Sequence, residues 1–411
     1  MRPGKRKFML KDDPGNLLAP VFGAYRQRLS DGKYAPKVQA LYFATVFHFG
    51  DWLKTEGVAL GQVRDWHIRQ FLADHMPSCE CYRHTRGDTH TNRAALNLLG
   101  RVMEGTGFAM TRTLTPVDAE LSRFDAKMRE VWGYSESTRA ARCRIVKRFL
   151  TSTEGAYDID LDKLSKSDVS RFITGDGNRG ASCARGLSGA IRCFLRYRQL
   201  IGDDVTPLLA GLPRPPRPEP STLPDVLTDV EVDALLQSFS ADFPQRRRAF
   251  AIARCLIDLG MRSSEVAGLT LDDINWARGT IRVTHRKGRR ADILPLLEAT
   301  GQAIADYILN ERPAIACANI FVRHRPPIGE PVGRRAVQTT MLAAYRRLGW
   351  DRSRVHILRH TLATRLLAKG TPMPVIADVM GHRSLDTTVV YTKLDSAWLS
   401  KVSLAWPGSA K

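Results

Sequence analysis

The chain has 411 residues and 43% of them are hydrophobic, so it can bury sizeable cores in about two to four domains. Its formal net charge of +20 favours a polyanionic partner, and nucleic acid is the leading one. No apolar run approaches the roughly 20 residues that cross a bilayer, and the N-terminus lacks a signal-peptide pattern, so we expect a cytoplasmic protein with no membrane partner. The seven cysteines fit reduced thiols and exclude a disulfide framework.

The front half of the chain has apolar residues at helical spacing, behind a basic N-terminal arm over residues 1–24. Residues 58–72 align without gaps with residues 159–173. This alignment predicts two similar helical modules in tandem, at 25–112 and 113–210. The alternative, that any two small helical bundles share such spacing, stays open with equal weight.

A proline-rich segment over residues 211–225 separates the two halves of the chain. It contains six prolines in fifteen residues, which exclude continuous helix and favour an extended connector. Arg214 and Arg217 lie within it, and we expect them to follow a phosphate backbone. The remaining residues, 226–411, form the last predicted domain.

The last domain is predicted to be helical except for one β-hairpin over residues 280–296, where apolar and polar residues alternate around a basic turn. The predicted helical stretches are 228–259 and 356 onward. The hairpin turn places Lys287 at a loop tip among further basic residues, namely His285, Arg286, Arg289 and Arg290.

Short polar motifs interrupt the apolar pattern of this domain. Gly260 ends one predicted helix, and Ser263 is the expected N-cap of the next, with Glu265 in its first turn and Arg262 exposed at the junction. His356 and Arg359 are one helical turn apart, which predicts that both are displayed on one face.

A third motif lies near the end of the sequence. Gly381 is expected to end a helix, His382 follows it, and Ser384 can cap a helix that carries Tyr391. Taken alone, Tyr391 would be interpreted as a buried aromatic residue.

The segments LGMR, RKG, HILRH, MGH and VVYTK occur in this order, with the tyrosine nine residues after the GH pair. In this the sequence resembles the tyrosine recombinase (phage integrase) family over roughly residues 115–400. Met261 and Met380 depart from the common pattern, but neither side chain carries a predicted catalytic atom. The resemblance implies a mainly α protein with a small β-sheet, in which helical core-binding domains precede an α+β integrase-like catalytic domain.

The resemblance also implies roles for single residues. Tyr391 would attack a DNA phosphodiester and form a 3′-phosphotyrosine. Arg262, Arg359 and His382 would bind the phosphoryl oxygens, as guanidinium geometry allows. Lys287 would protonate the leaving oxygen, His356 would transfer a proton involving Tyr391, and Glu265 would orient an arginine. The expected DNA-binding residues are Arg286, Arg289, Arg290, Arg214 and Arg217.

We therefore expect a site-specific recombinase of a mobile element that acts on double-stranded DNA without cofactor, metal or ATP. The resemblance implies a homo-tetramer on synapsed DNA, alone or with other recombinases, and association with the nucleoid. A C-terminal apolar stripe at Leu394, Trp398 and Val402 docks on a neighbouring subunit or packs on its own domain. The rival functions are a type IB topoisomerase and a DNA-binding accessory protein with a decayed site.

One further cluster has metal-ligating residue types. His75, Cys79, Cys81 and His84 lie within ten residues and could bind zinc. The Cys-x-Cys spacing is tighter than usual, so the favoured interpretation is free cysteines without a metal.

Overall fold

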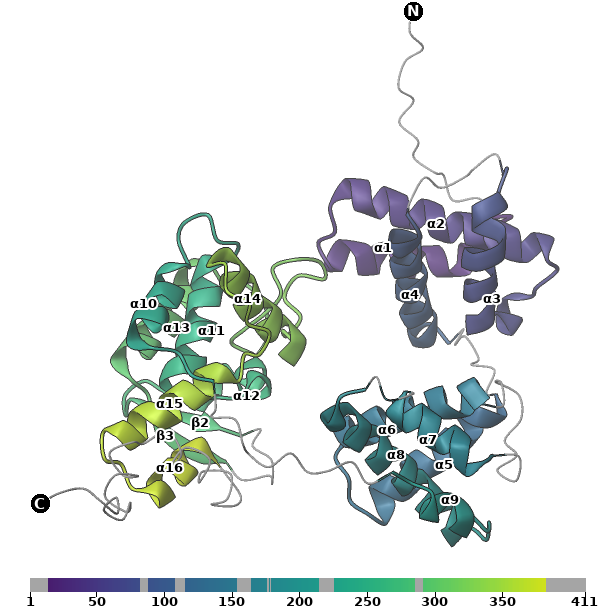
Figure 1. The fold of residues 1–411 in the computed structure, drawn as a ribbon. Coiled ribbons are helices and arrows are strands. Elements are labelled where there is room, and N and C mark those ends of the chain that lie inside the picture. Colours follow the sequence, from purple (N-terminus) through teal and green to yellow (C-terminus); the bar gives the residue numbers. More distant parts are fainter. Residues whose placement is uncertain are drawn as a thin grey trace, which may run out of the picture. The chain divides into compact units, whose positions relative to one another are not determined.

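The computed structural model is mainly helical with one small sheet, which confirms the predicted fold class (Figure 1). Contacts divide the described residues into two units, 14–19 with 45–213 and 20–44 with 225–381. None of the described helices is long and apolar enough to span a bilayer. The structure describes residues 14–81, 88–107, 115–153, 164–175, 177, 179–213, 225–284 and 291–381.

The front half is helical throughout its described segments. Its first helix begins at Ala19, inside the stretch predicted as an arm, because the side chains of Val21 and Phe22 are buried on one helical face. The elements are α1 (Ala19–Asp31), α2 (Pro36–Thr55), η1 (Leu60–Gln62), α3 (Asp65–Gln70), η2 (Phe71–His75), η3 (Met76–Ser78), α4 (Thr89–Gly105), α5 (Pro116–Glu130), α6 (Glu136–Thr153), α7 (Lys166–Thr174), α8 (Ala181–Leu200) and α9 (Thr206–Ala210).

Local capping explains where several of these helices begin and end. The hydroxyl of Thr115 accepts from the backbone N–H of Asp118 at 3.1 Å, and Pro116 occupies the first helical position of α5. Ser165 caps α7 in the same way through Asp168, at 3.2 Å. Gly175 ends α7 in the left-handed conformation, with φ 56°.

Phe71 and Phe172 occupy equivalent positions in the two aligned segments, and each ring contacts a phenylalanine of an earlier helix. Phe49 of α2 meets Phe71 edge-on, with ring centroids 5.1 Å apart and an interplanar angle of 67°. Phe149 of α6 meets Phe172 of α7 with centroids 5.1 Å apart and an angle of 62°. The two ring pairs have similar geometry and lie about 100 residues apart, and the duplication of the two modules stays a prediction.

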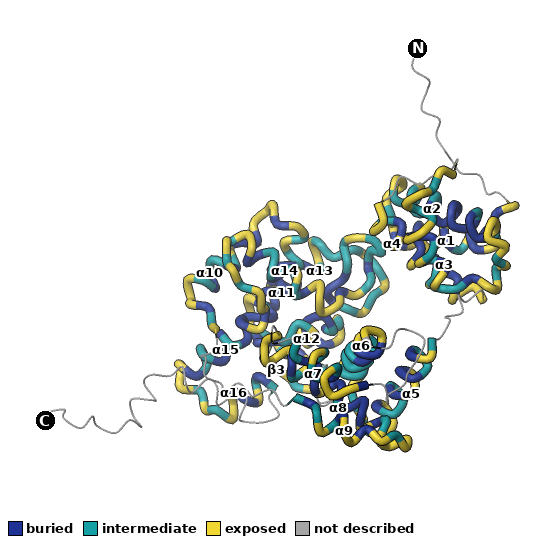
Figure 2. Tube along the Cα trace, turned by 45° about the vertical axis from the view of Figure 1, so that its right-hand side comes forward, coloured by how far each residue is buried: buried dark blue, intermediate teal, exposed yellow. Residues whose placement is uncertain are grey.

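The rest of the chain is helical around a short sheet. Its elements are α10 (Asp229–Gln237), α11 (Arg246–Asp258), α12 (Ser263–Gly268), η5 (Leu271–Asp273), β1 (Ile274–Asn275), β2 (Thr280–Val283), β3 (Asp292–Pro295), α13 (Glu298–Asn310), α14 (Arg334–Arg347), α15 (Ile357–Ala368) and α16 (Met373–Met380). Buried residues concentrate on α11, which supplies much of this core (Figure 2).

The predicted helical stretch over 228–259 is helical at both ends and interrupted in the middle. It is split into α10 and α11, because Phe239 and Phe243 between them pack edge-on into the core with centroids 5.0 Å apart. The chain re-enters helix after Gln245, whose φ is 49°. Burying two rings from one short loop outweighs helical continuity there.

The predicted hairpin is confirmed, and β1 adds a third antiparallel strand that the pattern had not indicated. Ile281 pairs with Leu294 in register, and both side chains are buried. Ile293, next to Leu294 in β3, is exposed. A strand of four residues is too short for alternation to fix its buried face.

Candidate active site

Four of the predicted catalytic and orienting residues lie in the described part of the chain: Arg262, Glu265, His356 and Arg359. Lys287, His382 and Tyr391 lie outside the described residues. The same holds for the predicted DNA-binding residues Arg214, Arg217, Arg286, Arg289 and Arg290, and for the C-terminal stripe of Leu394, Trp398 and Val402.

Arg262 is held at the junction between α11 and α12. Its Nη1 donates to Glu265 Oε1 at 2.7 Å, and its backbone N–H donates to Glu265 Oε2 at 2.8 Å. Glu265 is buried, whereas a quarter of the Arg262 side chain is exposed. The carboxylate therefore fixes the guanidinium while leaving part of it open to a ligand.

The helix start differs by one residue from the expectation. Arg262 occupies the N-cap position and Ser263 is the first helical residue, so Ser263 does not cap α12. The Glu265 carboxylate satisfies the backbone N–H of Arg262 in place of a hydroxyl cap.

Arg359 lies in the first turn of α15 and is 1% exposed. The prediction that His356 and Arg359 are both displayed was therefore wrong for Arg359. Its Nη1 donates to the carbonyl of Gly260 and its Nη2 to the carbonyl of Met380. A buried guanidinium is stable here because backbone oxygens accept its hydrogen bonds.

His356 precedes α15 and is exposed. Desolvation by the surrounding protein lowers the pKa of its imidazole to about 4, and the nearby His360, Arg359, Arg262 and Arg334 act in the same direction. The neighbouring cations would disfavour the charged ring even where water reaches it. The side chain is therefore neutral near pH 7 and can accept a proton or a hydrogen bond.

The end of α16 meets both arginines. Gly381 ends this helix in the left-handed conformation, as expected, with φ 55°. Its carbonyl accepts a long hydrogen bond of 3.4 Å from Arg262 Nη2, next to the Met380 carbonyl that binds Arg359. His382 is the next residue in the chain, so the segment that contains His382 and Tyr391 begins directly after these two contacts.

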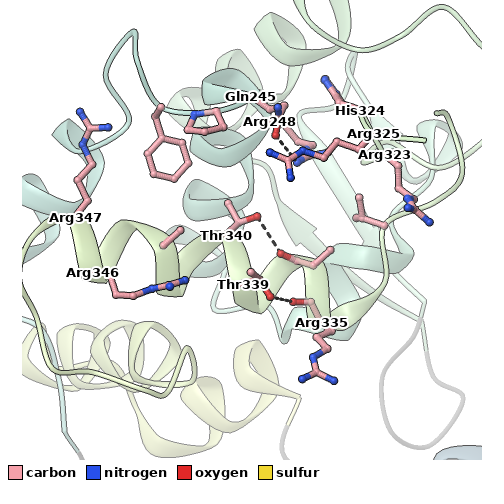
Figure 3. A pocket seen from close by; sticks show the side chains of 15 residues that line it. Gln245, Arg248, Arg323, His324, Arg325, Arg335, Thr339, Thr340, Arg346 and Arg347 are labelled. Atoms are coloured by element: carbon pink, nitrogen blue, oxygen red, sulfur yellow. Dashed lines mark hydrogen bonds between the residues drawn. The ribbon is translucent and has the colours of Figure 1, made fainter. Parts of the chain in front are cut away.

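A hollow of about 970 Å³ with many arginines lies on this unit (Figure 3). Motif reasoning did not single it out, although the clustered arginines of α14 were a visible signal. Arg335 and Arg346 are exposed on α14, and the neighbouring Arg334 acts electrostatically on His356. The other arginines that line the hollow are Arg248, Arg323, Arg325 and Arg347.

Of the predicted metal ligands, His75, Cys79 and Cys81 lie close together, and His84 lies outside the described residues. The structure adds His48, which sequence reasoning missed. His48 belongs to α2, where its flanking residues Phe47 and Phe49 made the position look like ordinary core.

Comparison with known proteins identifies the family. The model of the phage integrase family matches residues 225–397. A putative integrase/recombinase, y4rA of Sinorhizobium fredii (strain NBRC 101917 / NGR234), is 31% identical over 370 residues, covering 88% of each chain. The chain belongs to the phage integrase (tyrosine recombinase) family. The resemblance drawn from the motifs is thereby confirmed, and this tyrosine recombinase functions in DNA recombination.

Two further comparisons extend this result. The tyrosine recombinase XerC of Rhizobium meliloti (strain 1021) is 32% identical to this chain over 308 residues. The match covers 70% of this chain and 92% of XerC. A solved structure of the XerH site-specific recombinase, bound to a palindromic difH substrate, has 19% identity and a TM-score of 0.53. It covers 82% of this chain and 94% of its own, and this likeness supports the fold.

Proposed function

We propose that this tyrosine recombinase cleaves and rejoins double-stranded DNA through a covalent 3′-phosphotyrosine at Tyr391. The observation that carries the proposal is that Arg262 and Arg359 donate to the adjacent carbonyls of Gly381 and Met380, and that both arginines act electrostatically on His356. From Gly381 the chain continues to His382 and Tyr391. Two guanidinium groups at one point suit the charge that develops on phosphoryl oxygens.

In the proposed reaction, the Tyr391 oxygen forms a bond to phosphorus while the bond to the 5′-oxygen breaks. Arg262, Arg359 and His382 stabilise the non-bridging oxygens in the transition state. Lys287 gives its proton to the leaving 5′-oxygen, and the phenol proton passes to His356. Rejoining is the reverse sequence, with a 5′-hydroxyl attacking the phosphotyrosine.

The lowered pKa of His356 supports this assignment. A tyrosine hydroxyl titrates near 10, so its attack requires an acceptor for the proton. An imidazole that is neutral at pH 7 is such an acceptor, and a protonated one is not. Side-chain cations supply the charge stabilisation and the covalent bond retains the bond energy, so the proposed reaction uses neither metal nor ATP.

The arginine-lined hollow beside α14 is proposed to bind DNA phosphates. Arg335 and Arg346 on α14 are exposed, and exposed guanidinium groups gain most from exchanging water and counterions for phosphate. The proposed setting is a mobile element whose ends are exchanged by a tetramer of this chain, alone or with partner recombinases, on DNA in the nucleoid. The predicted division into arm, two front modules, linker and catalytic domain remains part of this proposal.

The test uses a suicide DNA substrate that carries the protein's own element end with a nick beside the scissile phosphate. The full chain should form a covalent adduct, visible as a protein band shifted by the attached strand. The Tyr391→Phe variant should bind the same DNA but give no adduct. Absence of the adduct in the native protein, or an undiminished adduct in the variant, contradicts the proposal.

A further inference from the structure

We propose that His48, His75, Cys79 and Cys81 bind one Zn²⁺ ion, which links the loop after η3 to helix α2. One nitrogen or sulfur atom from each residue is available, and these four atoms all lie within 4.8 Å of one another. His48 comes from α2, His75 from the end of η2, and the two cysteines from the segment that follows. Nothing in the recombination mechanism uses these residues.

The spacing of the ligand atoms matches a tetrahedral metal site. The Nε2 atoms of His48 and His75 are 3.1 Å apart, Cys79 Sγ is 3.4 Å from His48 Nε2, and Cys81 Sγ is 3.7 Å from His75 Nε2. A tetrahedral Zn²⁺, with bonds of about 2.0–2.1 Å to nitrogen and about 2.3 Å to sulfur, separates its ligand atoms by roughly 3.3–3.8 Å. A single ion can therefore contact all four atoms after small shifts.

The ligand chemistry points to zinc in a structural role. Two thiolates and two neutral imidazoles form a set that zinc prefers, and their two negative charges balance those of the ion. Such neutrality suits a site where His48 is buried and His75 and Cys79 are partly buried. Because the protein supplies all four ligands, no position is left for water or substrate, which distinguishes a structural from a catalytic zinc.

Aromatic packing positions both imidazole rings before any metal arrives. The ring of Phe71 stacks on His75, with centroids 5.3 Å apart, and meets His48 edge-on at 5.1 Å. In the second module the corresponding ring, Phe172, has the guanidinium of Arg148 over it at 5.3 Å. The guanidinium of Arg148 thus contacts Phe172 in the second module, whereas the proposed ligand His48 contacts Phe71 in the first. We therefore place the metal site in the first module alone.

The competing interpretation is a hydrogen-bonded cluster of two histidines and two thiols without a metal. Metal content distinguishes the two. The full chain is purified without a polyhistidine tag, loaded with Zn²⁺, passed over a desalting column and assayed for bound zinc. We expect about one Zn²⁺ per chain, and X-ray absorption should find a shell of two sulfur and two nitrogen atoms, with zinc–sulfur distances near 2.3 Å.

Two pairs of variants locate the site. The Cys79→Ser, Cys81→Ser double variant should lose the ion, whereas Cys183→Ser, which removes an exposed cysteine elsewhere, should retain it. His48→Gln should lose the ion, whereas His84→Gln should retain it, because His48 rather than His84 is the fourth ligand. A chelator should lower the melting temperature of the native protein and of Cys183→Ser, but not that of the double variant.

The spectroscopic measurement on native protein decides the question even if a variant fails to fold. Lack of zinc in the loaded native chain, a shell of nitrogen and oxygen alone, or full zinc content in His48→Gln would each overturn the proposal.

Discussion

Arg359 has structural contacts in addition to its proposed catalytic role. Its guanidinium is the proposed phosphate ligand, and it also links the carbonyls of Gly260 and Met380 in a buried position. Arg262, at the same site, is partly exposed and pairs with a carboxylate instead. Substitutions at the two positions should therefore differ in their effect on stability and agree in their effect on catalysis.

We expect Arg359→Gln to slow formation of the covalent adduct by roughly 10²–10³-fold, because a preorganised donor to the transition state is removed. It should also lower the free energy of unfolding by about 1–3 kcal/mol, since two buried carbonyls lose their donor. Arg262→Lys is the comparison: it keeps a cation beside the buried Glu265 but removes the guanidinium, so we expect a loss of rate with a smaller loss of stability. Rates come from suicide substrates and stabilities from urea unfolding. Equal stability losses in both variants would contradict the structural role of Arg359.

His356 should make this protein less stable in acid. Its pKa is about 4 in the folded protein and 6.5 in an unfolded chain, so the unfolded chain binds the proton more readily. The destabilising effect is absent above pH about 6.5 and grows as the pH falls toward 4. In His356→Gln the melting temperature should consequently fall less steeply over this window than in the native protein. Parallel curves for the two proteins would show that the pKa is not depressed.

At the scale of elements, the turn between α11 and α12 depends on Gly260. Its φ is +57°, and a Cβ atom there would lie 2.9 Å from Leu362 Cδ2. Gly279, in the turn before β2, has a similar φ of +59°, but no heavy atom lies within 4 Å of a Cβ built on it. A side chain at Gly279 would therefore meet backbone strain alone, whereas one at Gly260 would meet backbone strain and a steric clash.

Gly279→Ala should cost about 1–2 kcal/mol, the strain of a left-handed conformation alone. Gly260→Ala should cost more, because the added methyl group also displaces Leu362 and disturbs the carbonyl that accepts from Arg359. Urea unfolding of both variants measures the difference. If the two variants are equally destabilised, the close approach to Leu362 does not contribute to the free energy of unfolding.

Local elements were predictable from the sequence, and contacts between distant segments were not. The β-hairpin and the helix end at Gly381 follow from alternation and from glycine chemistry within a few residues. The burial of Arg359 depends on carbonyls 99 and 21 residues away, which no local pattern encodes. His48 was missed for the same reason, because Cys79, its partner, is 31 residues further along the chain.

At the scale of the whole molecule, a net charge of +20 predicts salt-sensitive binding to DNA. The hollow beside α14 is lined by six arginines. If phosphates bind there, removing its exposed arginines should change the salt dependence as well as the affinity.

The Arg335→Gln, Arg346→Gln double variant should bind DNA more weakly, and the slope of log K against log salt should fall by about 0.9 for each phosphate that the variant no longer binds. Arg278→Gln is the control, since Arg278 is exposed in the turn before β2 and does not line the hollow. Fluorescence anisotropy at several salt concentrations gives both slopes. A slope that changes equally in the control would assign the effect to overall charge.

The adjacent carbonyls of Met380 and Gly381 give the two arginines a common anchor at the root of the segment that leads to Tyr391. If both guanidinium groups bind the phosphate as proposed, each of them also contacts a carbonyl just before the segment of the proposed nucleophile. Removing either one loosens the anchor for both functions, so their energetic contributions overlap. A double-mutant cycle on Arg262 and Arg359 should accordingly be strongly non-additive, with the second substitution costing much less activity than the first.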